Sequence, residues 1–298
     1  MFLRITTLLA LSVASLLAAE NNLKWTALPD LPGGLGVAGP FVGVHNDALI
    51  IGGGANFPDG VPWRPTAGGG VSAKVYHDTI HVITRDGDDY SIAEAKAKLP
   101  RTLGYGISVP TADGVLCIGG EWREAGVTHR SAKVFAFGQA DGQVVIDENY
   151  PALPKDTTAS AGALVGETVY VAGGNSGDGA TKNFWALDLA KRGTDDFKWV
   201  ALPPWDGPAR THLLASVQHD GATDCLYIFS GRMKDGDGHW RMLGDAHKFN
   251  PNSGEWKKIH DILPSGDGQP RCVMAGTVAP IGANQLLVFG GANGKRFI

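Results

Sequence analysis

LIIGGG, residues 49–54, is the first of five stretches in which a short apolar run ends in a glycine doublet. The others are LCIGG (116–120), YVAGG (170–174), YIFSG (227–231), where Ser230 replaces the first glycine, and LVFGG (287–291). The last glycines, at 54, 120, 174, 231 and 291, are 66, 54, 57 and 60 residues apart. A period near 50 residues with several strands in each unit is typical of a β-propeller, in which four-stranded blades surround a channel. The sequence therefore predicts an all-β propeller.

Each unit divides into four antiparallel strands. The first is rich in small residues, as in GVAGPFVGV (36–44), and the second ends in the glycine doublet. The third alternates around an aromatic residue, as in KVYHDTIHV (74–82), and the fourth often contains a tryptophan, such as Trp199 or Trp256. Alternation of apolar and polar residues favours strands over helices. About five blades are predicted, and the fifth is incomplete because residue 298 falls within it.

The N-terminus indicates export. Arg4, the apolar run 5–17 and Ala18–Ala19 predict a signal peptide over residues 1–19 and a periplasmic or secreted protein, with a retained membrane anchor as the alternative. Residues 20–298 are then one propeller domain. Because KWTALPDLP (24–32) is similar to FKWVALPP (197–204), residues 24–28 are predicted to be the outer strand that closes the last blade.

Composition excludes several classes of protein. Glycine contributes 42 of 298 residues, which suits many tight turns, while 43% hydrophobic residues suffice for a core. The net charge of −4 without a basic block argues against nucleic acid or an anionic membrane as partner. Cys117, Cys225 and Cys272 have no metal-binding spacing and are predicted to be buried core residues. KDGDGHW (234–240) lacks a closing glutamate and is predicted to be a solvated turn, not a calcium loop.

The glycine doublets resemble those of kelch repeats over the whole chain after the signal peptide. More specifically, residues 36–60 and 99–121 are similar to blades of the bacterial sialic acid (N-acetylneuraminate) mutarotases. These blades come first here, whereas the equivalent blades come last in the best-known periplasmic enzyme. The chain therefore resembles the cyclically permuted branch of that epimerase family.

The resemblance implies a six-bladed propeller that interconverts the α and β anomers of sialic acid without a metal or organic cofactor. This reaction needs a carboxylate for proton transfer and a cation, such as arginine, for the sugar's own carboxylate. The family's principal glutamate belongs to a blade that would follow residue 298, so the 298-residue chain by itself is expected to be inactive. Glu121, with Arg130 downstream, resembles that pair in a neighbouring blade and is our candidate catalytic carboxylate here.

Further candidates come from propeller geometry. The start of each innermost strand and the end of the next strand lie at the same end of a blade. Arg101, Arg210 and Arg271 are therefore expected to share one rim with the residues after the glycine doublets, which are Asn56, Glu121, Asn175, Arg232 and Asn293. His212, two residues after Arg210, is expected to face the same side as that arginine. The loop 60–72 is a candidate lid, with Trp63 and Arg64 reaching the mouth.

Each assignment has a structural alternative. The three arginines are equally well explained as braces between blades. The asparagines suit turns, and Glu121 suits a structural ion pair. The alternative function is a non-enzymatic kelch propeller that binds a glycan or a protein. The oligomeric state is not determined by the sequence.

Overall fold

The computed structural model describes residues 25–263 and 270–294, and in this part of the chain the fold is all-β. Four four-stranded antiparallel sheets follow one another along the sequence. The first contains β1 (Phe41–His45), β2 (Ala48–Gly52), β5 (Thr79–Asp86) and β6 (Asp89–Lys98); the second contains β7 (Ile107–Thr111), β8 (Gly114–Ile118), β11 (Val134–Ala140) and β12 (Gln143–Asp147). The third contains β13 (Ala161–Val165), β14 (Thr168–Ala172), β15 (Phe184–Asp188) and β16 (Val200–Ala201); the fourth contains β17 (Leu214–His219), β18 (Asp224–Phe229), β21 (Ala246–Asn250) and β22 (Glu255–Lys258). A fifth sheet consists of β23 (Thr277–Ile281) and β24 (Gln285–Phe289) in the described residues.

The sheets are arranged as propeller blades. The inner strands β1, β7, β13, β17 and β23 are neighbours in this order, so consecutive blades lie side by side. The hydrophobic core lies between blades instead of inside one sandwich. Ile118 of the second blade, for example, belongs to the same buried cluster as Val171 and Trp185 of the third. The all-β kelch-type propeller predicted from the glycine doublets is confirmed.

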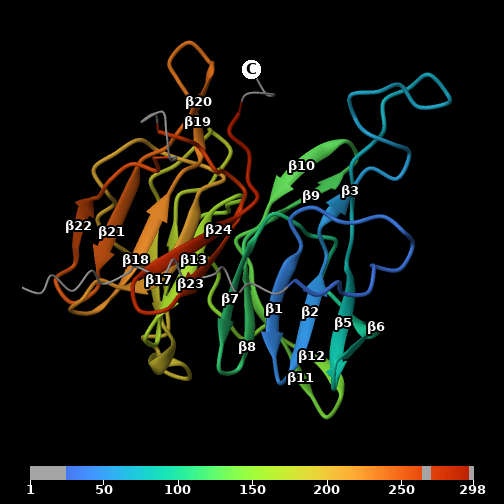
Figure 1. The fold of residues 1–298 in the computed structure, drawn as a ribbon, viewed down its shortest axis with the longest axis horizontal. Coiled ribbons are helices and arrows are strands. Elements are labelled where there is room, and N and C mark those ends of the chain that lie inside the picture. Colours follow the sequence, from blue (N-terminus) through green and yellow to red (C-terminus); the bar gives the residue numbers. More distant parts are fainter. Residues whose placement is uncertain (1–24, 264–269, 295–298) are drawn as a thin grey trace, which may run out of the picture.

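Three two-stranded hairpins extend from one face of the propeller. They are β3 (Ala55–Asn56) with β4 (Val75–Tyr76), β9 (Glu121–Glu124) with β10 (Val127–Arg130), and β19 (Arg232–Lys234) with β20 (Trp240–Met242). Each begins directly after the glycine doublet of its blade, and Figure 1 shows all three on the upper side of the molecule. We call this side the mouth face.

The glycine doublets bring neighbouring blades into backbone contact. Gly119 has φ +65°, and a Cβ atom there would lie 2.7 Å from the Thr157 carbonyl oxygen of the next blade. The Gly120 amide donates a hydrogen bond to that same oxygen at 2.8 Å. A side chain would therefore be strained and would push the blades apart. Ser230 occupies the equivalent position in the fourth blade at φ 60°. Its hydroxyl oxygen accepts a hydrogen bond from the Val273 amide at 2.8 Å, which links this blade to the next.

A second set of backbone bonds runs around the propeller axis. The residues involved share a left-handed conformation with φ between 52° and 61°, and they are Gly39, Tyr105, Ala159, His212 and Ala275. The carbonyl group of each of the first four accepts a hydrogen bond from the amide of the next residue in the series. The Tyr105 amide donates to Gly39 at 2.7 Å, Ala159 to Tyr105 at 2.9 Å, His212 to Ala159 at 2.8 Å and Ala275 to His212 at 3.2 Å. We call these five residues the axial ring. They join all five sheets independently of side-chain packing.

Two strand predictions need correction. Residues 74–82 are not one strand: Val75 and Tyr76 pair with β3 in a mouth-face hairpin, and only β5 belongs to the blade. Residues 25–32 form no strand in the described chain. Trp25 instead packs edge-on against Phe289 of β24, with 5.6 Å between ring centroids. The role of residues 24–28 in closing a blade stays a prediction.

Other predictions are confirmed or lie outside the described residues. The three cysteines are buried and unpaired. The signal peptide over residues 1–19 falls outside the residues that the structure describes. In the part that is described, no helix is long and apolar enough to span a membrane.

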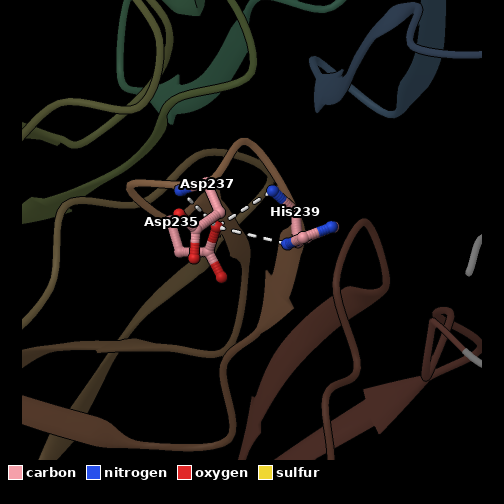
Figure 2. A group of neighbouring side chains, drawn as sticks. All are labelled: Asp235, Asp237 and His239. Atoms are coloured by element: carbon pink, nitrogen blue, oxygen red, sulfur yellow. Dashed lines mark hydrogen bonds and ion pairs between the residues drawn. The ribbon is translucent and has the colours of Figure 1, made fainter.

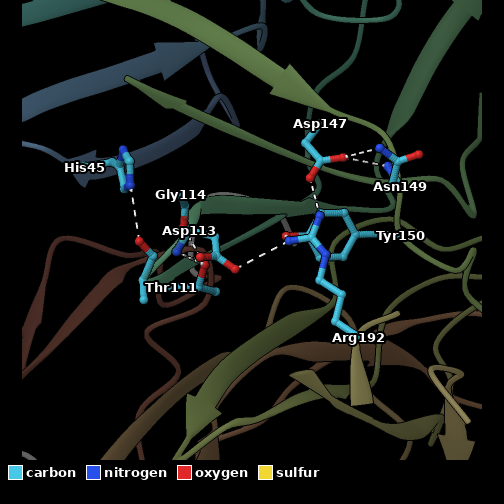
Figure 3. Close-up of polar contacts among 9 residues, drawn as sticks. His45, Thr111, Asp113, Gly114, Asp147, Asn149, Tyr150 and Arg192 are labelled. Atoms are coloured by element: carbon cyan, nitrogen blue, oxygen red, sulfur yellow. Dashed lines mark hydrogen bonds and ion pairs between the residues drawn. The ribbon is translucent and has the colours of Figure 1, made fainter. Parts of the chain in front are cut away.

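An arginine clamp joins the second and third blades on the face opposite the mouth (Figure 3). Arg192 follows a short 3₁₀ helix, Leu189–Lys191, and donates to the Tyr150 hydroxyl at 3.0 Å and to the Asp147 carboxylate. Its guanidinium also lies 4.5 Å from the Tyr150 ring centroid. Burial acts to raise the pKa of Asp147, but hydrogen bonds from Asn149 and Arg192 outweigh it and lower that pKa. Because these side chains are partly exposed, the clamp orients the blades more than it stabilises them.

A largely buried ion pair has the larger energetic role. Arg210 is 0% exposed and donates to the Ser230 carbonyl at 3.0 Å and to the Asp245 carboxylate at 2.5 Å. The ring of His247 lies 2.9 Å from the same carboxylate. Burial alone would raise the pKa of Asp245, but hydrogen bonds from His247 and Arg210 hold that pKa well below its ordinary value. The pair therefore fixes the fourth blade internally, between β18 and β21.

We expect Asp245→Asn to lower the free energy of unfolding by about 3–5 kcal/mol, because it leaves the Arg210 charge buried without a counterion. Urea denaturation measures this change. The matched control is Asp196→Asn, which removes a carboxylate that is 71% exposed and 3.1 Å from Lys198. The control is expected to keep the wild-type midpoint. Equal midpoints for Asp245→Asn and wild type would contradict the structural role of the pair.

Candidate active site

The residue that follows each glycine doublet occupies an equivalent place around the axis. Each forms a β-bridge with the residue that precedes an axial-ring residue; the bridges are Ala38–Ala55, Gly104–Glu121, Thr158–Asn175, Thr211–Arg232 and Met274–Ala292. Glu121, Asn175 and Arg232 therefore belong to one circle of positions on the mouth face. This confirms that these three residues share a rim.

Asn56 and Asn293 were assigned to the wrong register. They are the second residues after their doublets, whereas Glu121 is the first. Because successive side chains of a strand point to opposite faces, Asn56 does not share the orientation of Glu121. Its amide oxygen instead lies 2.9 Å from the His77 ring nitrogen. The asparagine is a structural partner of that histidine.

Glu121 forms the central polar contact of the mouth. The Tyr76 hydroxyl donates to Glu121 Oε1 at 2.5 Å and connects the first blade to the second. Tyr76 reaches this place because it is the cross-strand partner of Ala55, the first-blade counterpart of Glu121. Burial and the hydrogen bond to Glu121 raise the pKa of Tyr76 far above its ordinary value. The tyrosine is therefore a permanent donor, and it fixes the orientation of the carboxylate.

Arg130 lies beside Glu121, as the sequence predicted. The two residues are cross-strand partners in the β9–β10 hairpin, which places their Cβ atoms about 5 Å apart. The guanidinium extends toward the third blade, because a Cβ atom on Gly177 would lie 3.6 Å from Arg130 Nη1. Its Nε atom is buried and has no hydrogen-bond partner among the described residues. Such a group is available to an anionic ligand.

Two more cations flank the axial-ring residue His212. Burial, followed by the nearby charges of Arg232 and Lys74, lowers the pKa of His212 to about 4. The Lys74 ammonium lies 4.5 Å from the ring centroid of Tyr105, another axial-ring residue. Arg232 lies 4.2 Å from the Trp240 ring centroid, and its buried Nε has no partner in the described part of the chain. The mouth thus combines Lys74, Arg130 and Arg232 with the carboxylate of Glu121.

The three candidate arginines are not equivalent. Arg101 and Arg271 stand four residues before axial-ring residues 105 and 275, but Arg210 stands only two before His212. Arg101 stacks on Trp122, with 3.6 Å to the ring centroid, and alternation puts Trp122 on the other side of β9 from Glu121. Arg271 is exposed and precedes the fifth sheet, where its amide donates to the Ile262 carbonyl at 2.9 Å. None of the three belongs to the circle of Glu121 and Arg232.

Two further expectations are wrong. Arg210 does not line the pocket, because it is fully buried against Asp245. Nor does His212 face the same side of a strand as Arg210. The left-handed conformation of His212, with φ 57°, interrupts the alternation of side chains along the strand. The loop 60–72 does not cover the mouth: it extends away from the blades in Figure 1, and Trp63 is 77% exposed.

The turn between β19 and β20 gathers Asp235, Asp237 and His239 (Figure 2). The Asp235 carboxylate accepts from the Asp237 and His239 amides at 3.1 and 2.9 Å. These bonds build the turn itself. The solvated turn predicted from the sequence accounts for the cluster.

Sequence reasoning missed Lys74 and Tyr76. They were assigned to a blade strand, and no local signal separates a mouth-face hairpin from the third strand of a blade. Lys74 and Tyr76 are two residues apart, and this spacing puts both side chains on one face of an extended strand. Only the register of β4 against β3 shows that this is the face of Glu121.

His212 predicts a pH dependence of stability. Since the pKa is about 4 in the folded state and 6.5 in the unfolded state, the unfolded chain binds the additional proton between these values. The stability that the neutral form of His212 contributes at neutral pH is therefore lost as the pH falls from 6.5 to 4. We expect His212→Asn, which tolerates the left-handed conformation, to flatten this part of a plot of unfolding free energy against pH. An unchanged slope would contradict the assignment.

Comparison with known proteins agrees with the fold and the repeat type. A family model described as N-acetylneuraminate epimerase matches residues 150–297. Proteins named N-acetylneuraminate epimerase from Haemophilus influenzae (strain PittEE) and Escherichia coli (strain K12) are 30% identical over 146 residues and 31% identical over 147 residues. Each match covers 49% of this chain and 34% or 35% of the relative, so the chain spans about a third of the length of these curated relatives.

A solved structure, "Structure of YjhT", superposes over 91% of this chain and 82% of its own, with a TM-score of 0.70 and 16% identity. At this identity the likeness supports the propeller fold alone. The sequence matches concern the C-terminal half, and the cyclic permutation itself stays a prediction. Residues 150–297 are therefore similar to the N-acetylneuraminate epimerase family, by the family model and by its named relatives.

Proposed function

We propose that the chain is an isomerase of the N-acetylneuraminate epimerase type, acting on sialic acid at the mouth of the channel. The observation that carries the proposal is the set of three cations around one carboxylate, in a chain whose net charge is −4. A cationic, partly desolvated pocket selects an anionic ligand and strengthens its ion pairs. The resemblance implies no cofactor, and the proposed chemistry uses none.

Glu121 is positioned for the proton transfers. Ring opening removes the proton of the anomeric hydroxyl, breaks the bond between the anomeric carbon and the ring oxygen, and adds a proton to that oxygen; reclosure on the other face reverses these steps. A carboxylate can take the first proton and deliver it to the ring oxygen. Tyr76 occupies Glu121 Oε1, while Oε2 has no hydrogen-bond partner among the described residues. That second oxygen is the one we assign to the sugar.

Lys74 and Arg232 are assigned to the carboxylate of the sugar. Lys74 lies 4.5 Å from the Tyr105 ring, and Arg232 forms a bridge with Thr211, the residue before His212. Both residues are therefore close to the axial ring. Neutral His212 contributes hydrogen bonding without a further charge. Its Nδ1 already lies 3.2 Å from the Thr211 hydroxyl.

The first test follows the equilibration of freshly dissolved N-acetylneuraminate by NMR. If Glu121 supplies the acid/base chemistry, the 298-residue chain accelerates exchange of the anomers, contrary to the inactivity expected from its sequence. Glu121→Gln then reduces the acceleration by about 10²- to 10⁴-fold, the usual contribution of a general acid or base. Tyr76→Phe, which frees Oε1, is expected to lower the rate less.

If the sugar binds but its anomers exchange at the uncatalysed rate, Glu121 is not the catalytic carboxylate. The family's principal glutamate, expected after residue 298, then remains as the acid/base group. Binding without turnover even when that segment is present favours the alternative, a kelch propeller that only binds a glycan.

The cation assignment has its own prediction. Arg232→Met is expected to weaken N-acetylneuraminate binding by at least tenfold, as measured by calorimetry, because an uncompensated carboxylate is costly to bury. The matched control is Lys198→Met, at an exposed lysine paired with Asp196. Equal affinities for the two variants would exclude Arg232 from the site.

Two finer points extend the proposal. The N-terminal sequence supports secretion or a periplasmic location, and cell fractionation tests it. The family resemblance supports a six-bladed ring in the complete protein, with a small-molecule sugar, not nucleic acid or membrane, as partner.

A further inference from the structure

A cavity of about 550 Å³ opens beside the mouth, between the third and fourth blades. One wall is the loop Asn175–Ala180, and the other is the β19–β20 hairpin with Lys234 and Trp240. The cavity is continuous with the proposed site, because its lining includes Thr211, which bridges to Arg232 and lies 3.2 Å from the ring of His212.

The lining suits a hydroxylated and uncharged group. Arg232 and Lys234 lie 4.2 and 5.2 Å from the ring centroid of Trp240, and the residue is still 38% exposed. This exposed part offers an apolar contact for C–H groups of a sugar. Asp178 and Asp235 provide carboxylate acceptors for hydroxyl groups. The Asn175 side-chain oxygen Oδ1 accepts from the Gly177 amide at 2.9 Å, so the NH₂ of this side chain is left as a donor.

The two compartments differ in their excess of positive charge. The mouth holds Lys74, Arg130 and Arg232 against Glu121, whereas the cavity holds Lys234 against Asp178 and Asp235. Arg130 also reaches Gly177 at the cavity edge, and Lys155 lies 3.9 Å from Asp178, so the cavity is close to neutral. A sugar carboxylate is therefore attracted to the mouth more strongly than to the cavity. This difference orients any ligand that has an acidic end and a neutral polyhydroxyl end.

We propose that this cavity binds the uncharged polyhydroxyl side chain of the acidic sugar whose carboxylate lies in the mouth. The inference rests on the proposed function, which it deepens by naming a specificity subsite. Trp240 and the 175–180 loop act as binding residues here, without contact to the reacting atoms.

The test compares two ligands by calorimetry: N-acetylneuraminate, and its analogue in which the glycerol side chain is shortened to one hydroxymethyl group. Ala180→Leu fills the cavity from the third-blade wall and does not touch the stacking of Arg232 on Trp240. We expect it to raise the Kd of N-acetylneuraminate about tenfold and to leave the Kd of the short analogue unchanged. Trp240→Phe, which keeps a ring beneath Arg232, is expected to act in the same direction with a smaller effect.

Trp63→Ala, which removes an exposed indole outside the cavity, is the control and should change neither Kd. Thermal melting confirms that each variant is folded. The inference is overturned if Ala180→Leu weakens both ligands equally, or if it weakens neither. If Arg232→Met still weakens binding of both ligands, only this inference is overturned and the proposed function stands. If the wild-type protein binds neither ligand, the inference and the proposed function are both overturned.

Discussion

The axial ring of backbone hydrogen bonds is the constraint on which the remaining structure depends. A left-handed conformation costs a non-glycine residue about 1–2 kcal/mol, yet Tyr105, Ala159, His212 and Ala275 all adopt it. Tyr105, Ala159 and His212 each accept a bond from the next blade and donate one to the previous blade. The strain persists because blade packing over-determines it. If the second, third or fourth blade left its place, it would lose two backbone partners together with its apolar interface.

The ring also decides where chemistry is possible. Tyr105 and His212 have large side chains at positions where the other blades have glycine or alanine. A Cβ atom on Gly39 would lie 2.6 Å from Tyr105 Cδ1, so the small residue leaves room for the tyrosine ring. The residue after each glycine doublet is held against the ring by a bridge, which brings Glu121 and Arg232 to the same level. The hairpins that follow then add Tyr76 and Arg130 by cross-strand pairing. A polar site on rigid strands results, and its cations are held in place before a ligand arrives.

Similar sequence patterns led to different roles for the arginines. Arg210 has lost all contact with solvent and serves a buried ion pair, which breaks at a high energetic cost. Arg101 lies on an indole ring, and Arg232 lies on another indole but keeps a buried Nε without a partner. Burial excludes Arg210 from the pocket, whereas the choice between pocket and brace stays a prediction for Arg101 and Arg271.

The sequence by itself determined the repeat, the strand type and the propeller, because glycine doublets at positive φ and alternating apolar residues act over a few neighbouring residues. The family resemblance singled out Glu121 and Arg130, and the structure shows that they are cross-strand partners of one hairpin. Tertiary structure alone decided that Lys74 and Tyr76 join them, that Asn56 turns to His77, and that Arg210 is buried. These outcomes depend on register and on which blade packs against which. A one-residue change in register exchanges the two faces of a strand, and nothing local to that strand records the choice.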